Sequence, residues 1–126
     1  MSITLYPCPC CGFLAFDRHP GTYEFCPVCV WQDDLAQLKF PTLRIGPNKA
    51  SLIEAQLNYS EHGVSTIKRQ PSAPSSVGFE RDENWRPIDL KMNNIELTSV
   101  GDQGNTYPQD RTTLYYWRPA YWRRLP

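Results

Sequence analysis

The sequence has few of the features that would reveal a function at once. It carries no formal net charge, because 13 lysines and arginines balance 13 aspartates and glutamates. A domain that binds duplex nucleic acid is usually markedly basic, so this balance argues against one. No apolar run approaches the roughly 20 residues of a transmembrane helix, and the start, MSITLYPCPC, lacks the hydrophobic region of a signal peptide. We therefore expect a cytoplasmic protein that does not enter the membrane.

Catalytic motifs are also missing. The only histidines are His19, among turn-forming residues, and His62, near the expected end of a helix. A zinc deaminase would need a His-x-Glu ahead of its Pro-Cys-x-x-Cys, and neither histidine has a glutamate at that spacing. We find no glycine-rich phosphate loop and no plausible Ser-His-Asp set. The sequence therefore predicts a protein that is not an enzyme.

What the sequence does contain is a dense cysteine motif. All five cysteines lie between positions 8 and 29, and four of them form the Cys-x-x-Cys pairs Cys8 with Cys11 and Cys26 with Cys29. Four thiolates at this spacing suit one tetrahedral zinc ion. A disulfide framework is the weaker alternative, because disulfides are rare in the cytoplasm. Four cysteines would also fill the coordination shell, which predicts a structural zinc rather than a catalytic one.

Each pair has the composition of a tight turn that directs two sulfurs to one point. Pro9 presets a turn conformation, and Gly12 permits an unusual backbone after the second ligand. The second pair repeats the pattern with Pro27, and has Val30 where a glycine would be expected. The fifth thiol, Cys10, lies inside the first turn. It could be a packed spectator, a substitute ligand, or a reactive thiol whose pKa is lowered by a neighbouring metal.

A β-hairpin is predicted between the two pairs. Residues 13–16 and 22–25 are rich in strand formers, and residues 17–21 between them are turn-forming. The two ends of this hairpin would enter the two cysteine turns, which is the layout of a zinc ribbon.

A helix is predicted from Leu52 to about His62. Ser51 and Glu54 have the spacing of a capping box, and Gly63 suits the C-terminal end. Its apolar residues, expected in the core, are Leu52, Ile53, Ala55, Leu57 and Tyr59.

Two acidic residues, Asp33 and Asp34, follow the second cysteine pair. They could cap a short helical turn over residues 35–38, support the metal ligands, or contact a partner.

These motifs resemble the bacterial cysteine-rich CPCC family, a set of small proteins thought to bind zinc. The likeness covers roughly residues 6–63 and rests on the Cys-Pro-Cys-Cys run, on the Trp-Gln-Asp-Asp of residues 31–34, and on the Asn-Tyr of residues 58–59 before Gly63. The chain departs from the family at Val30, where members usually have glycine, and at Gln32, where they often have glutamate. The resemblance implies metal binding and a ribbon-like fold rather than any activity.

The second half of the chain is harder to interpret. Residues 70–78 are low in complexity and predict a linker or surface loop between a zinc module at 1–69 and a segment at 79–126. Residues 95–100 and 112–117 are rich in strand formers and could pair. The predicted fold class is therefore α+β, with a zinc-ribbon hairpin, one capped helix, and a β-rich C-terminal segment packed against them.

Aromatic residues and arginines are concentrated near the end of the chain. The candidates for binding a partner are Arg111, Tyr115, Trp117, Arg118, Tyr121, Trp122 and Arg123. Arg, Tyr and Trp are enriched at protein-interface hot spots, whereas single-stranded nucleic acid is bound by stacked aromatics in basic grooves. The alternative is that many of these residues form the core of a small fold.

These observations predict a non-catalytic protein with one structural zinc that binds a protein partner. An immunity protein that neutralises a bacterial toxin would fit by analogy with the size, charge and family. A zinc-ribbon regulator that binds nucleic acid is the competing interpretation.

Overall fold

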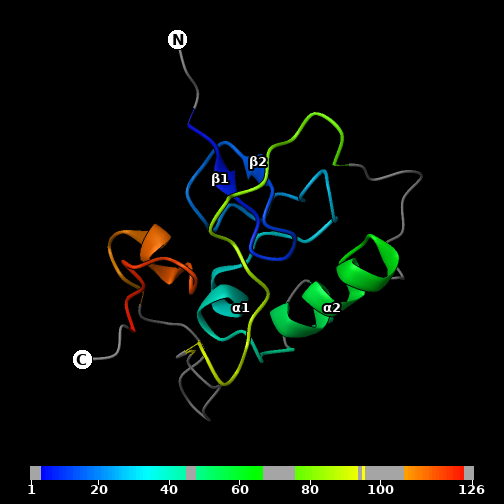
Figure 1. Cartoon of the computed structure of the whole chain (residues 1–126). Helices are drawn as coiled ribbons and strands as arrows, with labels where there is room; N and C mark the ends of the chain where they lie inside the picture. Colours follow the sequence, from blue (N-terminus) through cyan, green and yellow to red (C-terminus); the bar gives the residue numbers. More distant parts are fainter. Residues whose placement is uncertain (1–3, 45–47, 67–75, 94, 96–106, 124–126) are drawn as a thin grey trace.

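The computed structural model describes residues 4–44, 48–66, 76–93, 95 and 107–123. Its elements are the strands β1 (Tyr6–Pro7) and β2 (Leu14–Phe16), the helices α1 (Leu35–Lys39) and α2 (Leu52–His62), and the 3-10 helix η2 (Arg111–Leu114). In Figure 1 the strands lie above α1, while α2 and η2 lie on opposite sides of the molecule. None of the helices in the described ranges has the length and apolar character needed to cross a membrane.

The hairpin forms between different segments from those predicted. β1 pairs antiparallel with β2, with Tyr6 opposite Phe16 and Pro7 opposite Leu14. The partner of β2 is therefore the segment before the first cysteine, and the pairing expected with residues 22–25 is wrong. The first cysteine turn closes this hairpin through a short loop, which costs less chain entropy than a longer connection.

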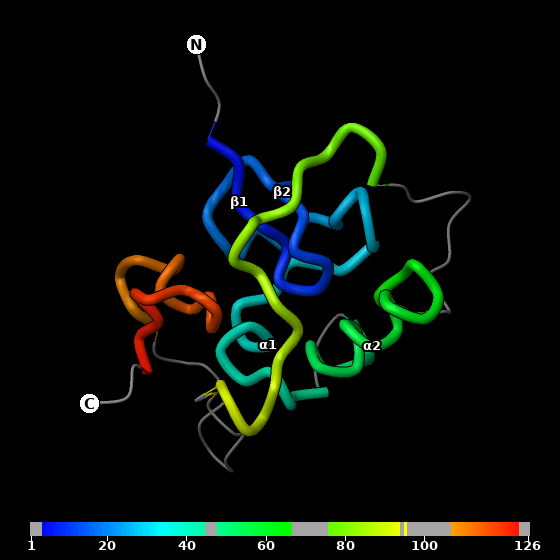
Figure 2. Tube along the Cα trace, viewed as in Figure 1, coloured from blue at the N-terminus to red at the C-terminus, as the bar shows by residue number. Residues whose placement is uncertain are grey.

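A third segment extends the hairpin from far along the chain. The Leu14 N–H donates to the Glu80 carbonyl at 2.7 Å, and the Asp82 N–H donates to the Gly12 carbonyl at 2.8 Å. Figure 2 shows this yellow-green segment running past the blue hairpin and on towards the helices. The chain that follows the predicted linker thus returns to the cysteine module and packs on it.

The predicted helix and both of its ends are confirmed. In α2 the Ser51 hydroxyl accepts from the Glu54 N–H at 3.1 Å, and the Glu54 carboxylate accepts from the Ser51 N–H at 2.9 Å. Gly63 ends the helix in the left-handed conformation, with a φ of 77°. A cap of this kind contributes about 1 kcal/mol, so the helix is strongly specified by its local sequence.

The buried face of α2 differs from the prediction at one position. Leu57 was expected in the core, but 59% of its surface is exposed. Leu52, Ala55, Gln56 and Tyr59 occupy i, i+3, i+4 and i+7, so they form a single strip, and Leu57 lies outside it. Gln56 is 7% exposed. The packed face of α2 therefore includes this glutamine and not the leucine at the next position.

Asp34 confirms the capping interpretation of the acidic pair. Its carboxylate accepts from the Gln37 N–H at 3.0 Å and begins the short helix α1. Gln37 is fully buried and donates to the carbonyls of Leu43 and Ala50 at 2.9 and 2.7 Å. The loop between α1 and α2 is therefore held by side-chain amides.

The C-terminal segment contains no strand within residues 107–123, so the strand predicted at 112–117 is wrong. The Asp110 carboxylate accepts from the Thr112 N–H at 3.0 Å and caps η2, because an Asp at this position offers the backbone a helical turn in place of an extended ladder. Leu114 and Tyr115 join the main core. The strand predicted at 95–100 falls, apart from Ile95, outside the described residues.

Candidate metal centre

The two Cys-x-x-Cys pairs have the same backbone hydrogen bonds. In each turn the first cysteine donates its N–H to the carbonyl five residues later and accepts from the N–H four residues later. The distances are 2.9 and 2.7 Å in the first turn and 2.8 and 2.9 Å in the second. The sequence predicted this repeat, and its consequence is that two similar turns present two sulfurs each.

Both turns place one residue in the left-handed region directly after the second cysteine. Gly12 has a φ of 82° and Val30 a φ of 64°. Glycine adopts this conformation without a steric penalty, but a β-branched residue is strained there. Val30 therefore occupies a position where the backbone geometry favours glycine.

Val30→Gly is expected to stabilise the zinc-loaded protein by about 1 kcal/mol. Relief of roughly 1–3 kcal/mol of strain should outweigh the greater chain entropy that glycine brings to the unfolded state. Denaturant unfolding at a fixed excess of zinc measures the change. Val30→Ala is the matched control, because alanine keeps a Cβ at positive φ. If the alanine variant were the more stable of the two, the strain argument would fail.

Four sulfurs meet at one point inside the protein. Cys8, Cys11, Cys26 and Cys29 offer atoms that all lie within 4.8 Å of one another. The Sγ atoms of Cys8 and Cys29 are 3.6 Å apart, and those of Cys11 and Cys26 are 3.8 Å apart. A tetrahedral zinc with bonds of about 2.3 Å separates its sulfur ligands by about 3.8 Å, so the spacing fits such an ion.

The chemistry of the four thiols also fits a metal. None of them forms a disulfide, and each has no exposed surface. Burial raises the pKa of Cys8 and of Cys29 well above the usual thiol value, whereas hydrogen bonds from Cys11, Cys29 and Cys8 hold the pKa of Cys26 far below it. A cation between the sulfurs would offset the cost of holding thiolates in so buried a space.

The four sulfurs belong to the main core. The buried residues grouped with the cysteines are Phe16, Val28, Trp31, Leu38, Leu52, Ala55, Leu114 and Tyr115. They come from the hairpin, the second cysteine turn, both α-helices and the C-terminal segment. A metal held by the four sulfurs would therefore join these parts of the fold within one core.

Cys10 is not one of the four grouped sulfurs. It has no exposed surface, and burial raises the pKa of its thiol. A reactive cysteine needs access and a lowered pKa, so the structure favours the packed spectator among the three alternatives.

Cys10→Ser is therefore expected to keep the metal. The variant should bind one equivalent of zinc, measured by elemental analysis of purified protein. Loss of zinc from this variant alone would mean that the first turn uses Cys10 as a ligand.

Residues far along the chain support the first cysteine turn. The Arg81 Nε donates to the Cys11 carbonyl at 2.9 Å, and the Trp85 indole N–H donates to the Pro9 carbonyl at 3.0 Å. Trp85 also packs on Gly12, where an added Cβ would lie 2.5 Å from the indole ring. Sequence analysis missed these contacts, because no local pattern links positions more than 60 residues apart.

Gln56 is a second buried residue that supports the same turn. Its Nε2 donates to the Pro9 carbonyl and to the Tyr116 hydroxyl, both at 2.9 Å, and its Oε1 accepts from the Ile88 N–H at 2.9 Å. One glutamine thus joins α2, the first turn, the returning segment and the C-terminal segment.

Asp33 stabilises the chain that leads to the second turn. Its carboxylate accepts from the N–H groups of Gly21 and Thr22 at 2.7 and 2.8 Å and from the Thr22 hydroxyl at 3.1 Å. Burial raises the pKa of this carboxyl despite these bonds. It is 3% exposed, which leaves no surface for the partner contact considered from the sequence.

The candidate partner-binding residues differ in burial. Tyr115 and Tyr121 are 1% and 6% exposed and belong to the core, which was the alternative for this cluster. Trp117 donates its indole N–H to the Asp82 carboxylate at 3.0 Å, and Arg118 contacts the same carboxylate at 3.4 Å.

The remaining members of that cluster lie nearer the surface. Arg111 is exposed and donates to the Pro20 carbonyl at 3.4 Å. Trp122 is 39% exposed, and the Arg123 guanidinium lies 5.9 Å from the centre of its ring. Both histidines are exposed, and neither belongs to the group of four sulfurs. His19 contacts the Tyr6 ring, and His62 is the last residue of α2.

Comparison with known proteins agrees with the cysteine geometry. The family model described as Cysteine-rich CPCC matches residues 6–75, which include both cysteine pairs, α1 and α2. No match to a curated protein is found. Because the matched range is more than half of the 126 residues, the chain belongs to the Cysteine-rich CPCC family.

Proposed function

We propose that this protein is a non-catalytic, zinc-stabilised module that binds a protein partner. The observation that carries the proposal is the group of four fully buried sulfurs, at a spacing that fits a tetrahedral ion, within the main core. A closed shell of four cysteines has no position for a substrate. The metal then acts on the fold, and any function lies on the outer surface.

Zinc is the metal that we propose for the site. A tetrahedral set of four sulfurs suits zinc or iron, and zinc adds structural energy without redox chemistry. Cys8, Cys11, Cys26 and Cys29 would bind it as thiolates, with the two turns setting the positions of the sulfurs. Elemental analysis together with a visible spectrum separates the two metals, because an iron–thiolate site is coloured.

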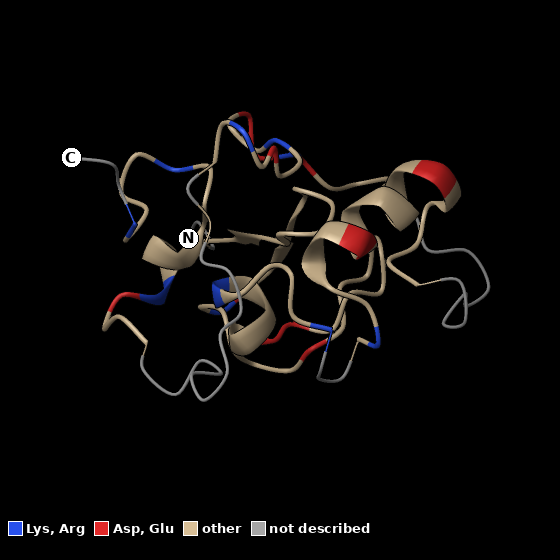
Figure 3. Cartoon of the chain, turned by 90° about the horizontal axis from the view of Figure 1, so that it is seen from below, with Lys and Arg blue, Asp and Glu red and all other residues tan. Residues whose placement is uncertain are grey.

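A protein is favoured over nucleic acid as the partner because of the charge distribution. Figure 3 shows lysines and arginines interspersed with aspartates and glutamates along the described chain, rather than gathered on one side. Nucleic acid binding draws on a concentrated basic surface. Exposed aromatic side chains such as Tyr23, Phe25 and Trp122, at 60%, 52% and 39% exposure, are typical of protein contacts. We propose that the protein partner is a toxin, which this protein neutralises by such contacts.

The test combines affinity capture from the source cell with a nucleic-acid titration at two salt concentrations. We expect a protein to be captured, and Trp122→Ala to weaken its binding by about 2 kcal/mol if Trp122 is an anchor. Leu57→Ala, which also removes an exposed apolar side chain, is the control. Submicromolar, salt-sensitive binding to nucleic acid with no protein captured would favour nucleic acid over a protein as the partner.

A further inference from the structure

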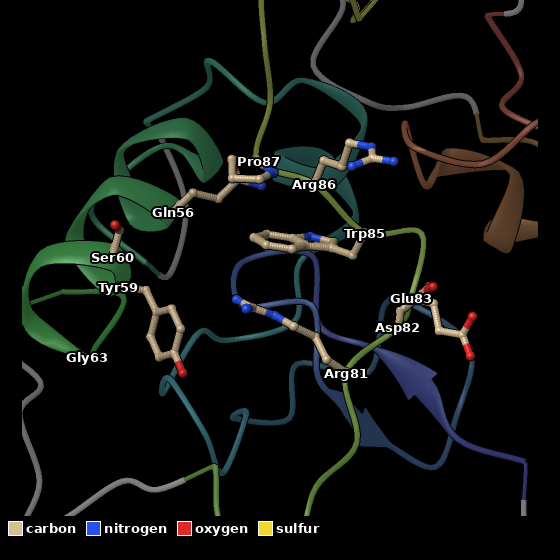
Figure 4. Close-up of a pocket in the computed structure, with 10 residues that line it drawn as sticks. All are labelled: Gln56, Tyr59, Ser60, Gly63, Arg81, Asp82, Glu83, Trp85, Arg86 and Pro87. Carbon is tan, nitrogen blue, oxygen red and sulfur yellow. The ribbon is translucent and has the colours of Figure 1, made fainter.

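A pocket of about 800 Å³ lies between α2 and the returning segment that supports the first cysteine turn. Its walls include Tyr59 and Ser60 from α2 and Arg81, Trp85 and Arg86 from the segment. Figure 4 shows the Arg81 guanidinium beneath the Trp85 ring, with its end turned towards Tyr59. None of the candidate partner-binding residues between positions 111 and 123 is among the residues that line this pocket.

Arg81 is held in place at this pocket. Its Nε donates to the Cys11 carbonyl at 2.9 Å, and its guanidinium carbon lies 4.9 Å from the Phe13 ring centre and 4.8 Å from that of Trp85. Within the described residues, no group accepts a hydrogen bond from its two terminal nitrogens. These nitrogens form a pre-oriented pair of donors, which is the arrangement that binds a carboxylate through two parallel bonds.

The aromatic walls are also fixed before any ligand arrives. Trp85 is anchored by its indole bond to Pro9 and by its packing on Gly12. Tyr59 belongs to the packed strip of α2 and is half-buried. Rigid aromatic side chains that lose little entropy on binding are typical of interface hot spots.

The charges around the pocket favour one anionic group rather than many. Arg81 and Arg86 share the pocket lining with the exposed Glu83, whose negative charge offsets part of theirs. Asp82 is occupied by the Trp117 indole and by Arg118. A strand of phosphates would need several uncompensated cations in a row, whereas a single carboxylate needs one oriented guanidinium.

We propose that this pocket binds an acidic side chain of a partner protein, with Arg81 pairing with the carboxylate and Trp85 and Tyr59 contacting the apolar residue beside it. The inference rests on the proposed function only in that the ligand is a protein. It places recognition next to the metal centre, because the same segment that forms the pocket supports the Cys11 carbonyl.

The test uses the full-length, zinc-loaded protein and a library of random linear peptides displayed on phage. We expect the enriched peptides to contain Asp or Glu next to an aromatic or aliphatic residue. Arg81→Gln should weaken the best synthetic peptide about tenfold or more, and replacing its acid by the matching amide should have a similar effect. Arg18→Gln removes an exposed arginine outside the pocket, and should change the affinity by less than about twofold.

The variants are compared only after zinc content and the thermal unfolding midpoint are shown to match the parent protein. If Arg81→Gln fails this check, Arg81→Lys replaces it, since lysine keeps the charge but cannot form two parallel bonds. Enriched peptides without acids, affinities unchanged by the Arg81 variants, or no enrichment would overturn the inference. Peptides whose binding depends on Trp122 instead of Arg81 would contradict binding at this pocket, but would still support the proposed function. Oligothymidylate binding that depends on Arg81 would contradict both.

Discussion

Chelation of the metal is expected to unfold the protein under conditions in which the zinc-loaded form stays folded. The four sulfurs share the main core with Trp31, Leu52 and Tyr115, each at most 1% exposed. Structural zinc contributes on the order of 10–16 kcal/mol of apparent binding free energy. That equals or exceeds the roughly 5–15 kcal/mol by which a typical domain is stable. Circular dichroism and tryptophan fluorescence during titration with a chelator measure the loss of structure.

Single-ligand variants separate the loss of metal from any effect of the chelator. Cys26→Ser should not retain zinc and should be unfolded or strongly destabilised, because three thiolates cannot complete the tetrahedral shell. Cys10→Ser removes a thiol of the same burial that is not a ligand, and should behave like the parent protein. A metal-free protein that keeps its spectra, with the absence of zinc proven by elemental analysis, would contradict the structural role of the site.

Gln56→Ala is expected to lower the free energy of unfolding by about 2–4 kcal/mol. The change would leave the Ile88 N–H without its partner and would remove one bond each from the Pro9 carbonyl and the Tyr116 hydroxyl. A buried polar group left unsatisfied costs about 1–3 kcal/mol. Tyr116 also donates to the Arg86 carbonyl, so some of its hydrogen bonding would survive the substitution. Urea unfolding at a fixed excess of zinc measures the difference.

The neighbouring leucine is the matched control for this prediction. Leu57→Ala truncates an apolar side chain at the next position of the same helix, but Leu57 is 59% exposed. We expect its effect to stay within about 0.5 kcal/mol. If Leu57→Ala were as destabilising as Gln56→Ala, α2 would have to pack through a different face from the one described.

The features that could be predicted from the sequence are those whose causes lie within a few residues. The Ser51–Glu54 capping box, the end of α2 at Gly63, and the Asp34 cap of α1 each depend on one turn of chain. The same holds for the two cysteine turns, including the need for a left-handed residue at Val30. Because the turns were correct, the four grouped sulfurs were also predicted.

The features that could not be predicted depend on competition between distant segments. The choice of partner for β2 was settled by the shorter loop through Cys8 and Gly12 and by the return of residues 80–82 to the open edge. Nothing local marks Arg81 or Trp85 as supports for the first turn. Gln56 was missed for a different reason, because a glutamine enters a core only when its hydrogen-bond partners are already in place.

X-ray absorption at the zinc edge of the purified protein tests the central claim most directly. The account predicts one zinc per chain with four sulfur neighbours at about 2.3 Å and no nitrogen or oxygen ligand. A spectrum that requires nitrogen or oxygen ligands, or fewer than four sulfurs, would contradict the assignment of the site to Cys8, Cys11, Cys26 and Cys29.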